Sequence, residues 1–175
     1  YKKYSLSRIV PTEYDSLFRK QLLHGTVHDE GAAMLGGISG HAGLFATAND
    51  LMKLMELYRR MGNYGGEQLI SSDVLKEYTR YQFPENKNRR GLGFDKPLLN
   101  ISELKSDNGN TAESASPESF GHSGYTGTFV WVDPAYELSY IFFCNRVYPT
   151  RNNNLITDLN LRTKILQVIY DSIEN

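Results

Sequence analysis

Two apolar runs near the C-terminus constrain the fold of this chain more than any other feature. Residues 128–132 and 138–144 are rich in β-branched and aromatic side chains, and the short segment 133–137, which contains Pro134, separates them. Runs of this kind predict strands, and a short Pro-containing connection predicts an antiparallel hairpin. Because both runs are apolar almost throughout, we expect other elements to cover both faces of the hairpin.

Helical patterns lie on either side of that hairpin. Thr47 and Asp50 form a capping box, apolar residues follow at helical spacing, and Gly62 is placed to end the helix. Ser71 begins a shorter helical pattern, and residues 155–173 predict a long C-terminal helix. The expected buried positions are Leu51, Leu54, Met55, Tyr58 and Met61 in the first helix, Val74, Leu75 and Tyr78 in the second, and Leu161, Ile165, Val168, Ile169 and Ile173 in the third.

The first 46 residues carry weaker signals. Pro11 and Thr12 predict a helix start, with Thr12 as the N-cap and Asp15 in the capping-box position, and Gly25 ends that segment. Residues 25–46 contain six glycines interleaved with large apolar side chains, which predicts an ordered loop held close to other backbone or to a ligand. The apolar face expected for this helix consists of Tyr14, Leu17, Phe18 and Leu22.

Together these elements predict an α+β fold in which helices flank an antiparallel sheet. At 175 residues the chain is the size of one domain, with a helical part over about residues 11–82 and the sheet and C-terminal helix over about residues 89–173. Residues 91–94 are a candidate short strand. Residues 102–119 are polar enough to predict a surface loop.

Composition argues against several classes of function. A net charge of -1 and scattered Lys and Arg give no basis for nucleic-acid binding, and no apolar run is long enough to predict a membrane span. Cys144 is the single cysteine, so neither an internal disulfide nor a Cys-based metal site can form. His24, His28, Asp29 and His41 could suggest a metal site, but their spacing matches no zinc motif. We therefore expect neither a metal nor another cofactor.

His122, Ser123 and Gly124 are the strongest candidates for chemistry. A His/Lys-Ser/Thr-Gly triplet that opens a strand can present backbone N–H groups to an acyl oxygen, and its glycine lets a substrate approach closely. Serine hydrolases that use such a triplet also need a Ser-x-x-Lys nucleophile and a Tyr-x-Asn or Ser-x-Asn loop.

Two short matches to those partner motifs occur in the wrong place. Ser102 with Lys105 fits Ser-x-x-Lys, and Ser106 with Asn108 fits Ser-x-Asn. A working pair comes from separate elements that converge on one cleft, whereas these matches lie back to back in one polar segment. We interpret them as coincidences and expect the nucleophile to lie upstream of Tyr1.

Five short motifs occur in an order that points to a family. They are Val27-His28-Asp29, residues 35–45, Asp50-Leu51, residues 91–94 and residues 121–128. Together they resemble the C-terminal half of the serine β-lactamase-like family, which includes class C β-lactamases, penicillin-binding proteins and related esterases. The resemblance covers about residues 9–173. It looks closest to the β-lactamase-like domains that follow a family-3 glycoside hydrolase (β-N-acetylhexosaminidase-like) domain in some bacterial proteins, whose ending resembles residues 145–149 and 161–164.

The resemblance implies a fold and a set of roles. The fold is β-lactamase/transpeptidase-like, and this chain would be its C-terminal portion. His122-Ser123-Gly124 matches the third motif of the family, and the backbone N–H of Tyr125 matches one half of its oxyanion hole. The family's nucleophilic Ser, its Lys and its Tyr base would precede Ile9. His122 stands where true β-lactamases have Lys, and because imidazole is neutral over much of the physiological range, an esterase or peptidase-like substrate is favoured.

Two functions follow from the resemblance. One is a serine hydrolase that acts through an acyl-enzyme on a small-molecule or peptidoglycan-derived substrate in the periplasm, cell envelope or extracellular space, with this chain inactive alone. The other is a non-catalytic wall-binding or accessory module of a glycoside hydrolase. In both cases we expect the chain to pack against the upstream portion of the same protein, and to self-associate when that portion is missing.

Overall fold

A three-stranded antiparallel sheet forms the centre of the computed structural model, which describes residues 4–99 and 111–174. Its strands are β5 (Phe120–Ser123), β6 (Phe129–Asp133) and β7 (Leu138–Phe142), in the spatial order β5-β6-β7. The register pairs Trp131 with Gly121 on one side and with Tyr140 on the other. The predicted hairpin is therefore confirmed, with β6 and β7 as its strands.

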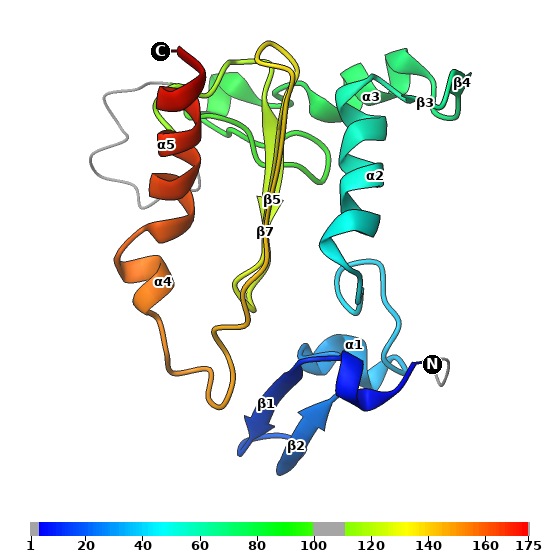
Figure 1. Ribbon diagram of the computed structural model, residues 1–175, viewed down its shortest axis with the longest axis vertical. Coiled ribbons are helices and arrows are strands. Elements are labelled where there is room, and N and C mark those ends of the chain that lie inside the picture. Colours follow the sequence, from blue (N-terminus) through cyan, green and yellow to red (C-terminus); the bar gives the residue numbers. More distant parts are fainter. Residues whose placement is uncertain (1–3, 100–110, 175) are drawn as a thin grey trace.

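Helices cover both faces of this sheet, as the apolar runs predict. Figure 1 shows the sheet edge-on, with α5 (Leu161–Glu174) on one side and α2 (Ala48–Arg59) on the other. Successive side chains of a strand point to opposite faces, so Trp131 joins the cluster under α5 while Val132 joins the cluster under α2. The first cluster contains Ala112, Phe129, Trp131, Tyr140, Leu166 and Tyr170, and the second contains Met55, Phe120 and Val132.

The capping box predicted at Thr47 begins α2. Thr47 Oγ1 accepts the backbone N–H of Asp50 at 3.2 Å. The helix ends at Arg59, so Met61, which was expected inside it, lies beyond its end with a left-handed φ of 48°, and Gly62 follows with a φ of 88°. The next helix, α3 (Ser72–Thr79), follows Ser71 as expected, although the Ser71 side chain makes no capping hydrogen bond. Of the three apolar positions expected to be buried in α3, only Leu75 is buried.

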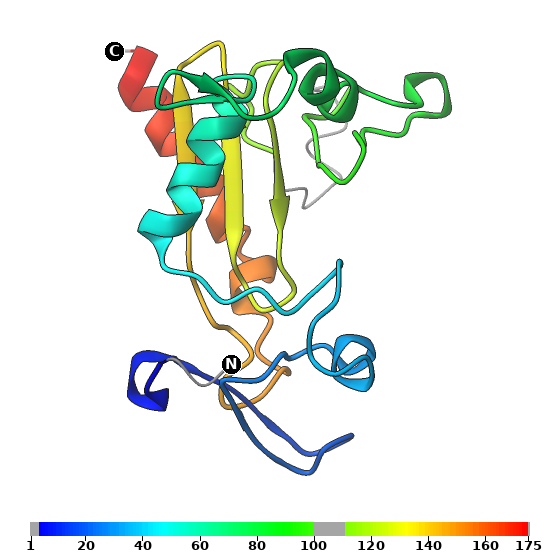
Figure 2. The same cartoon turned by 90° about the vertical axis from the view of Figure 1, so that its right-hand side faces the viewer.

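The helix expected to start at Thr12 does not form. Instead β1 (Pro11–Asp15) and β2 (Gln21–His24) pair as an antiparallel hairpin, which lies below the sheet in Figure 2. The Asp15 carboxylate accepts three backbone N–H groups of the turn that follows it, so it caps a turn and not a helix. Thr12 donates its hydroxyl to the Thr26 carbonyl. The expected apolar face is exposed throughout, at Tyr14, Leu17, Phe18 and Leu22.

The long C-terminal helix is two helices. α4 (Leu155–Asp158) and α5 are separated at Asn160, whose φ of 50° is left-handed and cannot continue a right-handed helix. The expected buried face of α5 is also wrong. Leu166 and Tyr170 are the fully buried residues of this helix. Tyr170 can be buried because its hydroxyl donates a hydrogen bond to Asp133. Ile169 is partly buried, whereas Leu161, Ile165, Val168 and Ile173 are 38–62% exposed.

The Gly-rich segment is largely irregular, as expected, but it contains a short helix that the sequence did not indicate. α1 (Glu30–Met34) begins at Asp29, whose carboxylate accepts the Ala32 N–H at 2.7 Å. The candidate strand at residues 91–94 is a turn. Its Gly91 N–H donates to the Phe94 carbonyl, and the flanking residues form only isolated bridges.

The remaining elements are short. They are the 3-10 turns η1 (Leu6–Arg8) and η2 (Pro84–Asn86) and the two-residue strands β3 (Asn63–Tyr64) and β4 (Glu67–Gln68). The coincidental motif residues Ser102, Lys105, Ser106 and Asn108 lie outside the described residues. The part of that segment that is described does not fit a surface loop, since Thr111, Ala112 and Ser119 are buried. None of the helices within residues 4–99 and 111–174 combines the length and apolar character that crossing a membrane requires.

Candidate active site

The His-Ser-Gly triplet ends a strand and does not open one. His122 and Ser123 are the last two residues of β5, a strand that the sequence did not indicate, and Gly124 begins the turn toward β6. In the described part of the sheet β5 is an edge strand. Its outer edge forms a bridge to Asp95 at Gly121, with N–H···O distances of 2.8 and 2.9 Å. The triplet therefore lies just beyond the bridged part of that edge.

The His122 imidazole is exposed and has a partner at each nitrogen. Nδ1 lies 2.8 Å from the Ser123 carbonyl oxygen, and Nε2 lies 3.4 Å from Nη1 of Arg90. Because a guanidinium can only donate, Nε2 accepts, and the ring hydrogen resides on Nδ1, from which it donates to Ser123.

Arg90 is a site residue that sequence reasoning missed. Its Nε lies 3.0 Å from Oδ1 of Asp95, whose side chain is 2% exposed, and Nη2 of Arg89 lies 3.9 Å from the same oxygen. A buried carboxylate thus forms an ion pair with a half-exposed guanidinium next to His122, although the contact is not aligned as a hydrogen bond. Nothing in the sequence linked Arg90 to a residue 32 positions away.

The turn after the triplet is tightly hydrogen-bonded. The Gly124 N–H donates to the Thr128 carbonyl at 2.8 Å, and the Gly127 N–H donates to the Gly124 carbonyl at 3.0 Å. A side chain at position 124 would collide with the Thr128 side chain. Close packing inside the turn is therefore sufficient reason for glycine at this position, whether or not a substrate approaches it.

Tyr125 forms the exposed corner of this turn. In a trans peptide the C=O and N–H groups point in opposite directions, and the Gly124 carbonyl faces the Gly127 N–H inside the turn. The Tyr125 N–H must therefore point out of the turn. Among the described residues it has no hydrogen-bond acceptor. Such an outward, unpartnered donor next to an edge strand is the geometry that an oxyanion donor requires.

A network of charged side chains lies beside Tyr125. The Tyr125 ring is 5.3 Å from the His28 ring, and Nε2 of His28 is 2.9 Å from Glu13, although this contact is not aligned as a hydrogen bond. Arg151 donates to both oxygens of Glu13, at 2.8 and 2.7 Å. Burial lowers the pKa of His28, and the Glu13 charge only partly offsets this. Burial would raise the pKa of Glu13, but its bonds to Arg151 hold that pKa below its ordinary value.

Arg19 and Asp15 extend the network into the hairpin. The Arg19 guanidinium donates to the Val27 and His28 carbonyls, at 2.7 and 2.6 Å, and to the Asp15 carboxylate at 3.1 Å. Burial would raise the pKa of Asp15, but the backbone N–H bonds and Arg19 hold it far below its usual range. These charges fasten the β1–β2 hairpin to the segment that carries His28.

The histidines weighed as metal ligands have other partners. His41 bonds Asp29 at 2.9 Å and Ser39 at 2.7 Å, and His24 bonds the Ile9 carbonyl at 2.6 Å. Within residues 4–99 and 111–174, His, Cys, Asp and Glu form no group of three or more that could hold a metal ion.

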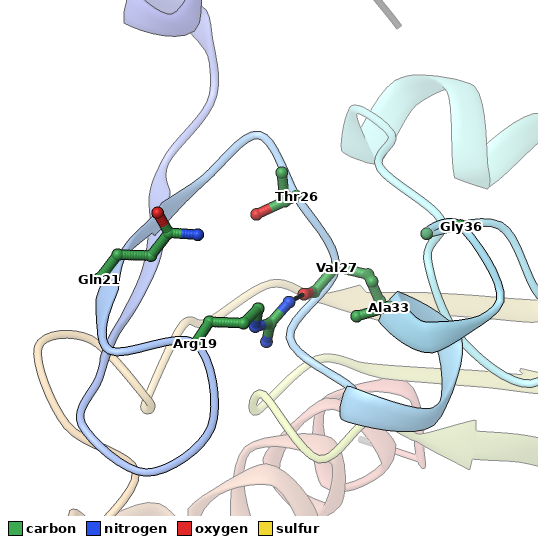
Figure 3. A pocket seen from close by; sticks show the side chains of 7 residues that line it. Arg19, Gln21, Thr26, Val27, Ala33 and Gly36 are labelled. Carbon is green, nitrogen blue, oxygen red and sulfur yellow. Dashed lines mark hydrogen bonds between the residues drawn. The ribbon is translucent and has the colours of Figure 1, made fainter.

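A cavity of about 410 Å³ lies on the hairpin side of the molecule and does not include the triplet. It opens between β2 and α1, and Figure 3 shows the Arg19 guanidinium directed at the Val27 carbonyl. Arg19 is already bonded to backbone and to Asp15. The cavity therefore offers no uncommitted cation to a ligand. Its lining residues are Arg19, Gln21, Thr26, Val27, Ala33, Gly36 and Gly37.

Comparison with known proteins assigns the fold described above to a family. The Beta-lactamase family profile matches residues 8–163 of this sequence. The chain belongs to the beta-lactamase family. Its antiparallel sheet flanked by helices is accordingly the β-lactamase/transpeptidase-like fold that the sequence motifs implied.

Relatives in this family are considerably longer. The chain is 35% identical over 129 residues to a protein named "Putative D-alanyl-D-alanine carboxypeptidase" from Salmonella enteritidis PT4, and the same values hold for the protein of that name from Salmonella typhi. Each match covers 73% of this chain but 28% of the relative. This chain therefore spans little more than a quarter of the length of these beta-lactamase-family relatives.

Similarity to a solved structure is weaker. The crystal structure of a "putative beta-lactamase" from Bacteroides dorei DSM 17855 superposes with a TM-score of 0.43 at 13% sequence identity. The superposition covers 79% of this chain and 45% of that one. The catalytic roles expected for His122, Ser123, Gly124 and Tyr125 are tested by none of these comparisons, and they remain predictions.

Proposed function

We propose that this chain is the part of a serine hydrolase that carries the substrate-binding strand and one donor of the oxyanion hole. The observation that supports this most directly is the outward Tyr125 N–H, at the end of an edge strand and next to His122. The substrate class that we propose is a peptide or ester derived from peptidoglycan. It rests on the similarity to the proteins named "Putative D-alanyl-D-alanine carboxypeptidase".

The chemistry proposed is acyl transfer through serine. A serine oxygen bonds to the substrate carbonyl carbon, its proton passes to a base, and the carbonyl oxygen becomes an oxyanion facing the Tyr125 N–H. The C–N or C–O bond then breaks as the leaving group takes up a proton, and water later hydrolyses the acyl-enzyme. One oxyanion donor is typically worth about 10²–10³ in rate. The serine and its base would come from sequence that precedes Ile9.

The matching experiment compares this chain with the full-length protein. We expect a fluorophosphonate or a fluorescent β-lactam to label the full-length protein covalently and to leave the 175-residue chain unlabelled. Label on Ser102 or Ser123 of the short chain would contradict the proposal, because the nucleophile would then lie within it. Absence of label and of ester hydrolysis in the full-length protein would also contradict it.

One observation favours a second function, a non-catalytic wall-binding or accessory module. Gly124 is required by its packing against Thr128, so this part of the triplet would persist without any catalysis. A peptidoglycan pull-down combined with a negative labelling result would support the accessory role. We also propose a location in the periplasm, cell envelope or extracellular space, and a fusion to a family-3 glycoside hydrolase domain, which the full-length gene would reveal.

A further inference from the structure

The geometry points to Arg146 as a positioning residue for the Tyr125 amide. This inference rests on the proposed function, because it assigns a supporting residue to the proposed oxyanion donor. Arg146 lies after β7, 21 positions from Tyr125. It belongs to the 145–149 segment that carried part of the family resemblance, but the resemblance assigned it no role in the site.

The Tyr125 N–H lies in the peptide unit that precedes Tyr125, and the unit that follows limits how far this corner of the turn can rotate. The unit that precedes Tyr125 is fixed by the bond from the Gly127 N–H to the Gly124 carbonyl at 3.0 Å. The unit that follows is fixed by Arg146, whose Nε donates to the Tyr125 carbonyl at 2.9 Å. The backbone N–H of Arg146 holds the next carbonyl, that of Thr126, at 2.8 Å. Arg146 therefore restrains the backbone on the side of Tyr125 that the turn's own hydrogen bond does not reach.

The Tyr125 side chain is restrained by the same guanidinium. The Arg146 guanidinium carbon lies 4.5 Å from the centroid of the Tyr125 ring, within the range of a cation–π contact. The Tyr125 ring also lies 5.3 Å from the His28 ring, measured between ring centroids. A residue that is 61% exposed is thus held at its ring and at its carbonyl.

The Arg146 guanidinium is also held by hydrogen bonds to the loop over residues 151–154. Its Nη1 lies 2.9 Å from the Arg151 carbonyl, 2.9 Å from the Asn153 carbonyl and 3.0 Å from the Asn154 side chain. A planar guanidinium can bind the Tyr125 carbonyl with one edge and the 151–154 loop with another, whereas a lysine ammonium cannot reproduce that fork. The turn that carries the proposed donor is therefore clamped to the loop after β7.

The test uses the full-length protein and a pair of ester substrates that differ only in having oxygen or sulfur at the scissile carbonyl. Sulfur is a poorer acceptor than oxygen, so the ratio of the two rates reports how well the oxyanion donors are aligned. We expect Arg146→Ala to lower kcat for the oxygen ester by about 10- to 100-fold with KM changed by less than about threefold. We also expect the oxygen-to-sulfur rate ratio to fall by about tenfold.

Matched variants separate positioning from simple loss of structure. Arg60→Ala removes an exposed arginine of α2 that pairs with Glu56, and should leave kcat and the rate ratio unchanged. Arg146→Lys keeps the charge and should still lower the ratio. If Arg146→Ala keeps the wild-type ratio, or loses activity only in proportion to its folded fraction, the inference is overturned. A wild-type protein that hydrolyses neither ester would instead contradict the proposed function.

Discussion

Tyr170 of α5 donates a hydrogen bond of 2.7 Å to the buried carboxylate of Asp133, at the end of β6. Asp133 also accepts the backbone N–H and the hydroxyl of Ser116 and the N–H of Ala135. Burial raises the pKa of Tyr170, and the Asp133 charge raises it further, so the phenol stays protonated and remains a donor. One carboxylate thus joins a helix, a strand end and the loop before β5.

Tyr170→Phe should lower the free energy of unfolding by about 1–3 kcal/mol, because a buried acceptor loses a donor while the ring stays in place. Urea unfolding followed by circular dichroism measures this. Tyr64→Phe, at an exposed position, is the control and should change stability by less than about 0.5 kcal/mol. Equal stabilities for the two variants would show that the Tyr170–Asp133 bond contributes nothing net.

The network beside Tyr125 predicts a loss of stability in acid. The pKa of His28 is lowered from 6.5 and that of Glu13 from 4.5, so the folded state binds these protons less readily than the unfolded state. Their stabilisation is complete above the unfolded pKa values and is lost as pH falls through the folded ones. The free energy of unfolding should therefore decline first below pH 6.5, through His28, and again below pH 4.5, through Glu13.

The variant His28→Gln tests whether His28 causes the decline in stability that begins below pH 6.5. His28→Gln removes the group that titrates near neutrality, so its decline should begin only below pH 4.5. Each group can contribute a slope of at most about 1.4 kcal/mol per pH unit. Urea unfolding at a series of pH values provides the comparison. A wild-type profile that is flat between pH 7 and the carboxylate range would show that His28 does not titrate on unfolding.

His122→Ala should impair catalysis more than stability in the full-length protein. His122 is exposed at the end of β5, and removing an exposed side chain typically changes stability by about 0.5 kcal/mol or less. Loss of a group that orients substrate or assists proton transfer typically lowers the rate by about 10²–10⁴. Ester hydrolysis and melting temperature should be compared with those of Lys53→Ala, a control on exposed α2 surface. Full activity in the His122 variant would make the triplet a structural feature.

The exposed side of α5 predicts self-association of the 175-residue chain. Leu161, Ile165 and Val168 follow one another at helical spacing and are 38%, 41% and 62% exposed. Apolar faces of this kind tend to be covered by a partner. Val168→Glu should weaken association in sedimentation velocity, whereas Val74→Glu, on exposed α3 surface, should not. A monodisperse monomer of the unmodified chain would contradict this prediction.

The elements predicted correctly are those whose signals are local. The capping box at Thr47, the glycine after α2 and the Pro-containing hairpin each depend on residues within one element or its turn. The burial of both faces of β6 and β7 could also be predicted from the sequence, because both strands are apolar almost throughout.

The elements predicted wrongly depend on distant partners. Thr12 and Asp15 have the spacing of a capping box, yet Asp15 caps a turn. The reason is that β1 pairs with β2, and that the Asp15 carboxylate lies close to Arg19 and Arg151. The buried face of α5 was assigned wrongly because a tyrosine hydroxyl needs a hydrogen-bond acceptor to be buried. The sequence alone does not show that Asp133 accepts the Tyr170 hydroxyl. The triplet could be found from the sequence, but the contacts that Arg90 and Arg146 make with it could not, because each reaches the candidate site from a distant part of the chain.

The pairing of Glu13 with Arg151 joins residues 138 positions apart, and Asn145 bonds the Pro11 and Thr12 carbonyls across a similar span. The ribosome synthesises the β1–β2 hairpin well before Asn145 and Arg151, which bind it. During synthesis Glu13 therefore stays hydrated and without its arginine partner until all three strands of the sheet have been made. Because of this order of synthesis, β1 is made before most of this chain but completes its native contacts only after Arg151 has been added.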